Sequence, residues 1–243
     1  MARLLAVRGA AMAFIALLAL VPVASALSGQ PYYLTLFTRI VVFGLAAVGL
    51  NLILGFGGLV SFGHALYIGI GAYAVGIPAY HGISSGFAHI GIALAVGALS
   101  ASLIGLVCLR ASGMAFIMIT LAFAQMFYFL GVSLRQYGGD DGLPVRSRSD
   151  FGLLNLDNAY VLYYLCLALL LLTLYALHRA VHARFGMVLR GCKSNERRMI
   201  ALGFPTLRYK LAAYVISALI CVIAGMLLAN LGESRFIFGS LLC

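Results

Sequence analysis

Apolar residues along the chain gather into long runs that are separated by short polar or glycine-rich stretches. Each run is close to the length of about 20 residues that an α-helix needs to cross the hydrocarbon core of a bilayer. Seven runs fit this description, at residues 9–27, 34–54, 61–80, 87–109, 114–134, 160–177 and 211–231. The pattern predicts an all-α polytopic membrane protein of about seven transmembrane helices, in which residues 1–243 form a single transmembrane domain.

The first run shares features with a secretory signal. Arg3 and Arg8 precede it, and Ala24-Ser25-Ala26 has the small residues of a cleavage site. The run is nevertheless longer than the apolar region of a signal peptide, which has about 7–15 residues. Because six further spans are predicted to follow, we expect an uncleaved first helix.

The third span, which is rich in glycine, gives the clearest local signal. Gly55-Phe56-Gly57-Gly58 interrupts the apolar pattern just before it, and Ser61 and His64 follow. Glycines at this density break or bend a helix, and the freed backbone groups must then face protein or a water-filled path. Two interpretations stay open. Either the broken helix lines a path with Ser61 and His64 near its lumen, or the glycines only allow close helix packing.

Other polar side chains at membrane depth are few. Asn51 and Gln125 are best explained as hydrogen-bonded ties between helices, although each is also a candidate for contact with a solute. The full set of substrate-path candidates is Asn51, Gly57, Gly58, Ser61, His64 and Gln125. All six acidic residues lie in predicted loops or at span ends. Proton- and sodium-coupled carriers commonly use buried carboxylates, so uphill transport by this chain would need energy from a partner.

The composition agrees with a membrane protein, because 64% of the residues are hydrophobic and 9% are charged, against about 25% charged in soluble domains. The formal net charge of +10 does not indicate nucleic-acid binding. Eight of the 16 Lys and Arg residues lie in the segment 179–210, where Glu196 alone opposes them. The positive-inside bias predicts that this segment and the N-terminus are cytoplasmic and that the loop 135–159 is outside.

The sequence predicts no enzyme, metal site or cofactor. Neither Lys193 nor Lys210 follows a glycine, so no phosphate-binding P-loop is present. The five cysteines are scattered without a C-x-x-C pair. His178 and His182 stand four residues apart with no third ligand in view, and we expect them to be interfacial residues at a helix end.

A short helix is predicted within the basic segment. Ser194 is expected to cap it, with Glu196 in its first turn, and Gly203 and Pro205 are expected to end it. One interpretation is a helix that lies on anionic lipid. The other is a lever that presses on a cytoplasmic partner through Ser194, Asn195, Glu196, Arg197 and Arg198.

Four stretches carry a family resemblance: residues 50–73 (LNLILGFGGLVSFGHALYIGIGAY), 118–126 (MITLAFAQM), 138–143 (GGDDGL) and 184–211 (RFGMVLRGCKSNERRMIALGFPTLRYKL). In this order they resemble the LivM-type permeases of branched-chain amino acid ABC importers. The resemblance implies a multi-pass subunit of a bacterial inner membrane that pairs with a second, related permease. It also implies two cytoplasmic P-loop ATPases, which hydrolyse the ATP, and a periplasmic solute-binding protein.

By the same resemblance, the residues around Asn195-Glu196-Arg197 are similar to a coupling segment that sits in an ATPase cleft, and Asp140 and Asp141 would face the binding protein. Two departures stand out. Gly191-Cys192-Lys193-Ser194 replaces the family's usual Ala-Ile-Arg followed by an acid, and relatives continue with further helices beyond the position of Cys243. We therefore expect a C-terminally truncated copy.

The sequence thus favours a permease subunit for branched-chain or other hydrophobic amino acids. The alternatives are a non-functional or regulatory fragment, a permease for urea or amides, and a passive channel.

Overall fold

The computed structural model describes residues 15, 17–23, 25, 31–83, 85–137 and 158–231. Within these residues the chain is built of helices, whose order is α2 (Pro31–Asn51), the π-helix η1 (Leu52–Phe56), α3 (His64–Tyr80), α4 (Gly86–Cys108), α5 (Met114–Ser133), the 3₁₀ turn η2 (Arg135–Tyr137), α6 (Ala159–His182), α7 (Arg184–Ala201) and α8 (Thr206–Leu231). Five segments are long and apolar enough to cross a membrane: α2 with η1, α4, α5, α6 and α8. The predicted all-α polytopic class is confirmed. α3 has 17 residues and is shorter than these five.

Two predicted regions fall largely outside the described residues. Of the first predicted span, residues 17–23 are helical, and the carbonyl of Leu18 accepts a hydrogen bond of 2.6 Å from the Tyr163 hydroxyl of α6. The loop predicted at 135–159 is described only at its two ends, so Asp140 and Asp141 lie outside the described residues.

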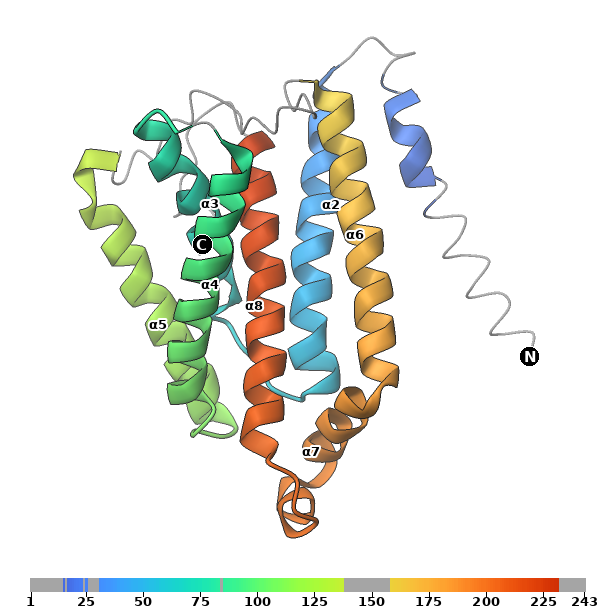
Figure 1. Cartoon of the computed structure of the whole chain (residues 1–243), viewed down its shortest axis with the longest axis vertical. Helices are drawn as coiled ribbons and strands as arrows, with labels where there is room; N and C mark the ends of the chain where they lie inside the picture. The colour runs from blue at the N-terminus through green and yellow to red at the C-terminus, as the bar shows by residue number, and fades with distance from the viewer. Residues whose placement is uncertain are drawn as a thin grey trace.

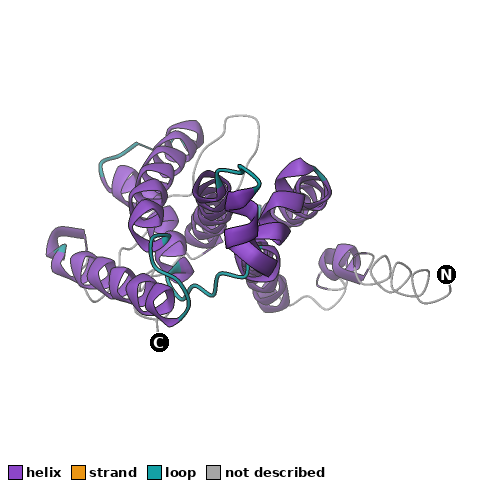
Figure 2. Ribbon diagram, turned by 90° about the horizontal axis from the view of Figure 1, so that it is seen from below, coloured by secondary structure: helices purple, strands orange, loops and turns teal. Residues whose placement is uncertain are grey.

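The helix α8 lies in the middle of the bundle and packs against α2, α3 and α4 (Figure 1). α6 packs on the far side of α2, and α5 contacts α3 and α4 at the opposite edge. α7 crosses one end of the bundle beneath α6 and α8, which Figure 2 shows from below. Among the five membrane-length segments, the most buried is α8, which corresponds to the last span predicted from the sequence.

Small residues on one face of α8 explain its central place. Ala213, Ser217, Cys221 and Gly225 recur every fourth residue, so they line one stripe of the helix, and all four are buried. A Cβ atom at Gly225 would overlap the carbonyl oxygen of Ile68 in α3. Small side chains let the backbones of membrane helices approach closely in this way.

The predicted break near the third span is present, and it precedes α3. The helix α2 continues as the wider turns of η1 and ends at Gly57, and Gly58 has a positive φ of 69° that an L-residue rarely adopts. α3 then runs without interruption through its own glycines. At Gly71 this agrees with the interpretation that the glycines allow close helix packing. There, the missing side chain makes room for the carbonyl oxygen of Val222 in α8.

The predicted basic loop is mostly helical, because α6 continues to His182 and α7 begins two residues later. α7 consists of two helical halves joined at Asn195, whose φ of −158° and ψ of 98° are extended. The Oδ1 of Asn195 accepts a hydrogen bond of 3.0 Å from the Arg198 N–H. Asn195 therefore caps the second half, and the prediction that Ser194 does so is wrong.

Ser194 does not cap the second half of α7 because it still belongs to the first half, where its hydroxyl donates to the carbonyl of Gly191 at 2.9 Å. The predicted end of the helix is confirmed. Gly203 has a φ of 84°, its N–H donates to the Ile200 carbonyl, and the Phe204 N–H donates to the Met199 carbonyl. This pair of bonds is the Schellman arrangement that ends many helices.

Candidate functional site

A buried polar cluster lies at the start of α3, where this helix meets α8 and α2. The Nε2 atom of His64 is 3.0 Å from the Ser217 hydroxyl, and its Nδ1 atom is 3.0 Å from the Ser61 hydroxyl. All three side chains are buried. Because a buried polar group without a partner costs free energy, the two serines are what allows a histidine to lie here.

The hydrogen bonds fix the orientation of the cluster. The Ser217 hydroxyl donates to the carbonyl of Gly49 in α2 at 2.7 Å, so its oxygen must accept from the Nε2–H of His64. In the neutral ring, Nδ1 is then the acceptor for the Ser61 hydroxyl. The cluster is therefore a directed chain of bonds that ties together α2, α3 and α8.

Two tyrosines enclose this cluster. The hydroxyl of Tyr67 in α3 donates to that of Tyr214 in α8 at 3.1 Å. Their rings stand edge-to-face to the His64 ring, with centroids 5.8 Å and 5.5 Å away. Edge-to-face pairs at such distances are favourable. In the described conformation Ser61 and His64 are thus closed off by protein, which agrees with the packing interpretation, and contact with a solute stays a prediction.

The glycine-rich break is linked directly to α7. The Nζ of Lys193 donates to the carbonyl of Gly55 at 2.7 Å, across 138 residues of sequence. The stem of the same lysine packs over Gly58, where a Cβ atom would come within 2.7 Å of Lys193 Cγ. A carbonyl of a broken helix needs a donor, and here α7 supplies it. The predicted path residue Gly58 therefore contacts α7.

The second half of α7 is held to α8 by an ion pair. Glu196 and Lys210 are 2.6 Å apart, and their side chains are 42% and 11% exposed. Ser194, Asn195, Arg197 and Arg198 are exposed on the same part of α7. Of the five residues predicted to contact a partner, Glu196 is thus paired with α8, and the other four are exposed, with Ser194 and Asn195 bonded within α7.

Buried beside this ion pair is the thiol of Cys192. Burial raises the pKa of the Cys192 thiol, and the nearby Lys210 offsets part of that effect. Because the thiolate is the reactive form of cysteine, this residue is a packed side chain and not a nucleophile.

Two of the predicted path residues lie apart from the cluster. Asn51 is the last residue of α2, where it lines a pocket of about 240 Å³ between α2 and α6. Gln125 is exposed on α5. The structure therefore does not bring the six candidates together in one place. Among the described residues, no three His, Cys, Asp or Glu side chains form a metal site.

Sequence reasoning missed the partners that the structure adds: Tyr67, Lys193, Lys210, Tyr214 and Ser217. For Ser217 a signal was present, since it belongs to the stripe of small residues on α8. For the lysines the signal was their rarity, because Lys193 and Lys210 are the only two in the chain. For the tyrosines no local pattern indicated a partner.

The helices of membrane length define a polytopic membrane protein. Its interior holds a buried polar cluster, and the basic helix α7, packed across one end, contacts that interior. The chain belongs to the family described as "Branched-chain amino acid transport system / permease component", whose model matches residues 32–242.

Two curated relatives are similar to the chain, and both are described as high-affinity branched-chain amino acid transport system permease protein LivM. The one from Escherichia coli (strain K12) is 26% identical and the one from Salmonella typhimurium is 25% identical, each over 217 residues. The match covers 79% of this chain and 51% of each relative, so the chain spans about half the length of these proteins. No solved structure matches the chain.

Proposed function

We propose that the chain is a permease subunit of an ATP-driven importer for branched-chain or other hydrophobic amino acids. Membership of the permease family supports the transport role. The bond from Lys193 to the carbonyl of Gly55 supports coupling, because it joins the surface helix α7 to the broken helix beside the buried cluster.

The proposed mechanism follows from that contact. Exposed Arg197 and Arg198 on the second half of α7 dock on a P-loop ATPase subunit, and closure of the ATPases displaces α7. Through Lys193 the displacement reaches the segment Leu52–Phe56, whose carbonyls and amides then rearrange around the substrate path. ATP is bound and hydrolysed by the partner subunits alone, and this chain performs no catalysis.

The remaining partners are a second, related permease and a periplasmic solute-binding protein, which would dock near Asp140 and Asp141. In this arrangement the chain is a multi-pass protein of a bacterial inner membrane with a cytoplasmic N-terminus. The basic residues at the α7 end of the bundle favour that orientation, because positively charged loops are retained in the cytoplasm.

The test is a tagged pull-down from native membranes in mild detergent, combined with uptake of radiolabelled leucine. The double variant Arg197→Glu/Arg198→Glu is expected to lose the ATPases while inserting normally. Arg179→Glu at the end of α6 is the control, since it makes a like change at another exposed arginine of the basic region. Unchanged uptake and unchanged recovery of the ATPases in the double variant would contradict the coupling role.

The same experiment separates the alternatives. A bait recovered without a second permease and ATPases favours a non-functional or regulatory fragment. Flux of leucine through proteoliposomes that hold this chain alone, without nucleotide, favours a passive channel. Competition of uptake by urea or acetamide, and not by valine or isoleucine, favours a urea or amide permease.

A further inference from the structure

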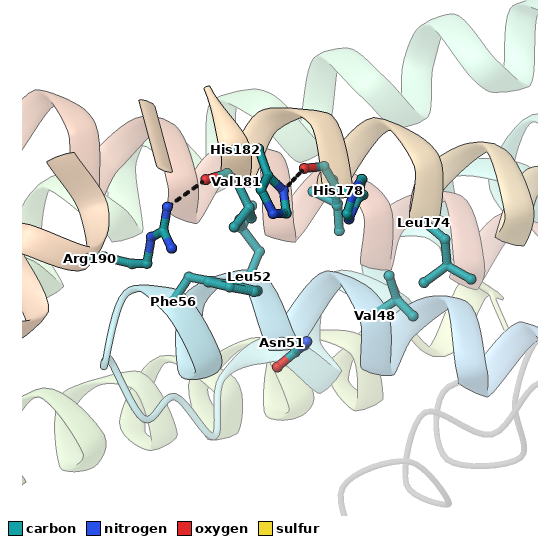
Figure 3. A pocket seen from close by; sticks show the side chains of 10 residues that line it. Val48, Asn51, Leu52, Phe56, Leu174, His178, Val181, His182 and Arg190 are labelled. Carbon is teal, nitrogen blue, oxygen red and sulfur yellow. Dashed lines mark hydrogen bonds between the residues drawn. The ribbon is translucent and has the colours of Figure 1, made fainter. Parts of the chain in front are cut away.

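The pocket between α2 and α6 changes character along its length. Leu174, His178 and His182 occupy successive turns of α6, four residues apart, and they lead from an apolar to a polar wall toward α7. Since an α-helix rises about 1.5 Å per residue, these three side chains cover about 12 Å of the pocket. Figure 3 shows Val48 and Asn51 along the α2 side, with Val48 across from Leu174. The polar end thus lies at His182, where the membrane-length helix α6 ends.

A guanidinium group stands at the polar end. The Nη2 atom of Arg190 donates to the carbonyl of Val181 at 3.2 Å (Figure 3). Its Nε–H donates to the carbonyl of Gly186 at 3.3 Å. These two bonds position the group and use two of its five N–H donors. The other donors are available to a ligand, and arginine is well suited to phosphate oxygens.

Hydrogen-bond acceptors lie beside this cation. The Nδ1 of His182 contacts the carbonyl of His178 at 2.7 Å, so Nδ1 carries the proton and Nε2 is an acceptor in the neutral ring. The amide of Asn51 offers one further acceptor and two donors. Among the ten lining residues, all within the described part of the chain, none carries a carboxylate.

We propose that this pocket binds an anionic glycerophospholipid. Its phosphate would lie against Arg190, the hydroxyls of its headgroup against His182 and Asn51, and part of an acyl chain along Val48 and Leu174. The polarity runs in the direction that a lipid in this leaflet requires, with the headgroup toward α7 and the chain toward the membrane interior. The site does not depend on the proposed transport function.

The charges of the pocket discriminate against related ligands. A free amino acid and a phosphatidylethanolamine headgroup both carry an ammonium group, which would lie near Arg190 with no carboxylate among the lining residues to neutralise it. An inorganic phosphate ion would use Arg190 and leave the apolar wall bare. A phosphatidylglycerol molecule satisfies both ends, and exposed Arg179 and Arg184 on the same side add a general attraction to anionic lipid.

Native mass spectrometry of the full purified chain in detergent tests the site. Dioleoyl phosphatidylglycerol, phosphatidylethanolamine and phosphatidylcholine are added at equal concentration, with glycerol phosphate, inorganic phosphate and leucine as free competitors. Three variants are compared: Arg190→Gln removes the cation, Leu174→Trp fills the apolar end, and Leu172→Trp makes the same change two residues away, at an exposed leucine that does not line the pocket.

We expect one phosphatidylglycerol to be retained in preference to the other lipids. Arg190→Gln and Leu174→Trp should each weaken its retention by about tenfold, since a charge-assisted hydrogen bond and an occupied chain site contribute at that scale. Leu172→Trp should leave retention unchanged. Leu174→Trp keeps the test decisive if Arg190→Gln disturbs the turn between α6 and α7.

Equal retention of the three lipids, or equal retention by Leu174→Trp and Leu172→Trp, would overturn the proposal. Full displacement of the lipid by glycerol phosphate or inorganic phosphate would instead assign a free-anion site. Displacement by leucine would assign the pocket to the solute. Each of these outcomes excludes a lipid site at this position.

Discussion

The α3–α8 interface and the end of the bundle that α7 covers, here called the α7 end, are both held by polar contacts. The side chains that make these contacts differ in length and in burial. At the interface, Gly71 and Gly225 let the backbones touch, and the bonds of His64 are made between short, buried side chains. At the α7 end, the long side chains of Lys193 and Glu196 reach across partly exposed space to single partners.

We infer from this difference which part of the bundle would shift more easily. Short side chains in backbone contact leave no room for sliding, because the packed interior is dense and its polar groups have no alternative partners. A partly exposed contact of a lysine or glutamate is worth at most about 1 kcal/mol, and its flexible stem can take up other geometries. We therefore treat the interface as the fixed frame of the molecule, and α7 as the element that the proposed partner would shift.

The largest effect on stability is expected from adding side-chain volume at the α3–α8 interface. Gly225→Val would drive a side chain into the backbone of Ile68, and we expect it to lower the free energy of unfolding by about 3 kcal/mol or to prevent stable folding. Gly44→Val is the matched control, because a Cβ atom there meets no atom within 4 Å. Size-exclusion profiles and thermal unfolding in detergent measure both, and equal behaviour of the two variants would contradict the close contact.

A smaller effect is expected from deleting one bond of the buried cluster. Ser217→Ala removes the acceptor of the His64 Nε2–H and the donor to Gly49, so we expect a loss of about 1–2 kcal/mol in the free energy of unfolding. Ser102→Ala is the control, because among the described residues the Ser102 hydroxyl bonds to the carbonyl of Ala98 in its own helix and not to another helix. Equal unfolding of these two variants in denaturing detergent would show that the cluster carries no interhelical energy.

The positions of the five membrane-length helices could be predicted because each depends on a local property, the length of an apolar run. The end of α6 was placed at Leu177, whereas the helix continues to His182. Long or polar side chains at a helix end reach the interface from within the helix, so polarity alone does not mark where the helix stops. The kink in α7 was missed for a related reason. Ser194 and Asn195 both have side chains that cap helices well. The sequence does not say which of the two takes the non-helical backbone conformation of a cap.

The partners of His64 could not be predicted, because Ser217 is 153 residues away and the choice depends on which face of α8 meets α3. The every-fourth-residue stripe of small side chains identifies that face, but it does not say which helix packs there. The resemblance of residues 50–73 and 184–211 to permeases marked both ends of the Lys193–Gly55 bond without indicating that they touch.

The movable end is tested by removing its link to the break. Lys193→Met loses the bond to the Gly55 carbonyl but keeps the stem over Gly58, so we expect the free energy of unfolding to change by less than about 1 kcal/mol. In the assembled importer, leucine uptake should fall by about tenfold while ATP hydrolysis continues. In the proposed mechanism, movement of α7 reaches the segment Leu52–Phe56 through the Lys193 contact, which this variant lacks. Lys193→Arg keeps a donor and is expected to retain more uptake. Full uptake in Lys193→Met would exclude this bond from coupling.

The smallest effect concerns the ion pair that holds the second half of α7. Glu196→Gln keeps the shape of the side chain and removes its charge. We expect a cost below about 1 kcal/mol because the position is 42% exposed and the amide oxygen still accepts a hydrogen bond from the largely buried Lys210. The sharper measurement is alkylation of Cys192 by N-ethylmaleimide, followed by peptide mass spectrometry. In the unaltered chain, burial raises the pKa of this thiol, so labelling is slow at neutral pH and keeps rising as the pH passes the ordinary range of a thiol.

Loosening the second half of α7 should expose Cys192 and raise its labelling rate by about threefold at fixed pH, since reactivity follows exposure and thiolate fraction. Arg197→Gln is the matched control, because it removes a charge at the neighbouring position, where Arg197 is exposed and has no ion pair among the described residues. If both variants label Cys192 at the same rate as the unaltered chain, Glu196 and Lys210 do not hold α7 in place. The polar contacts that hold α7 would then be those of Lys193 with Gly55 and of Arg190 with Val181, and α7 would be held even less firmly than the α3–α8 interface.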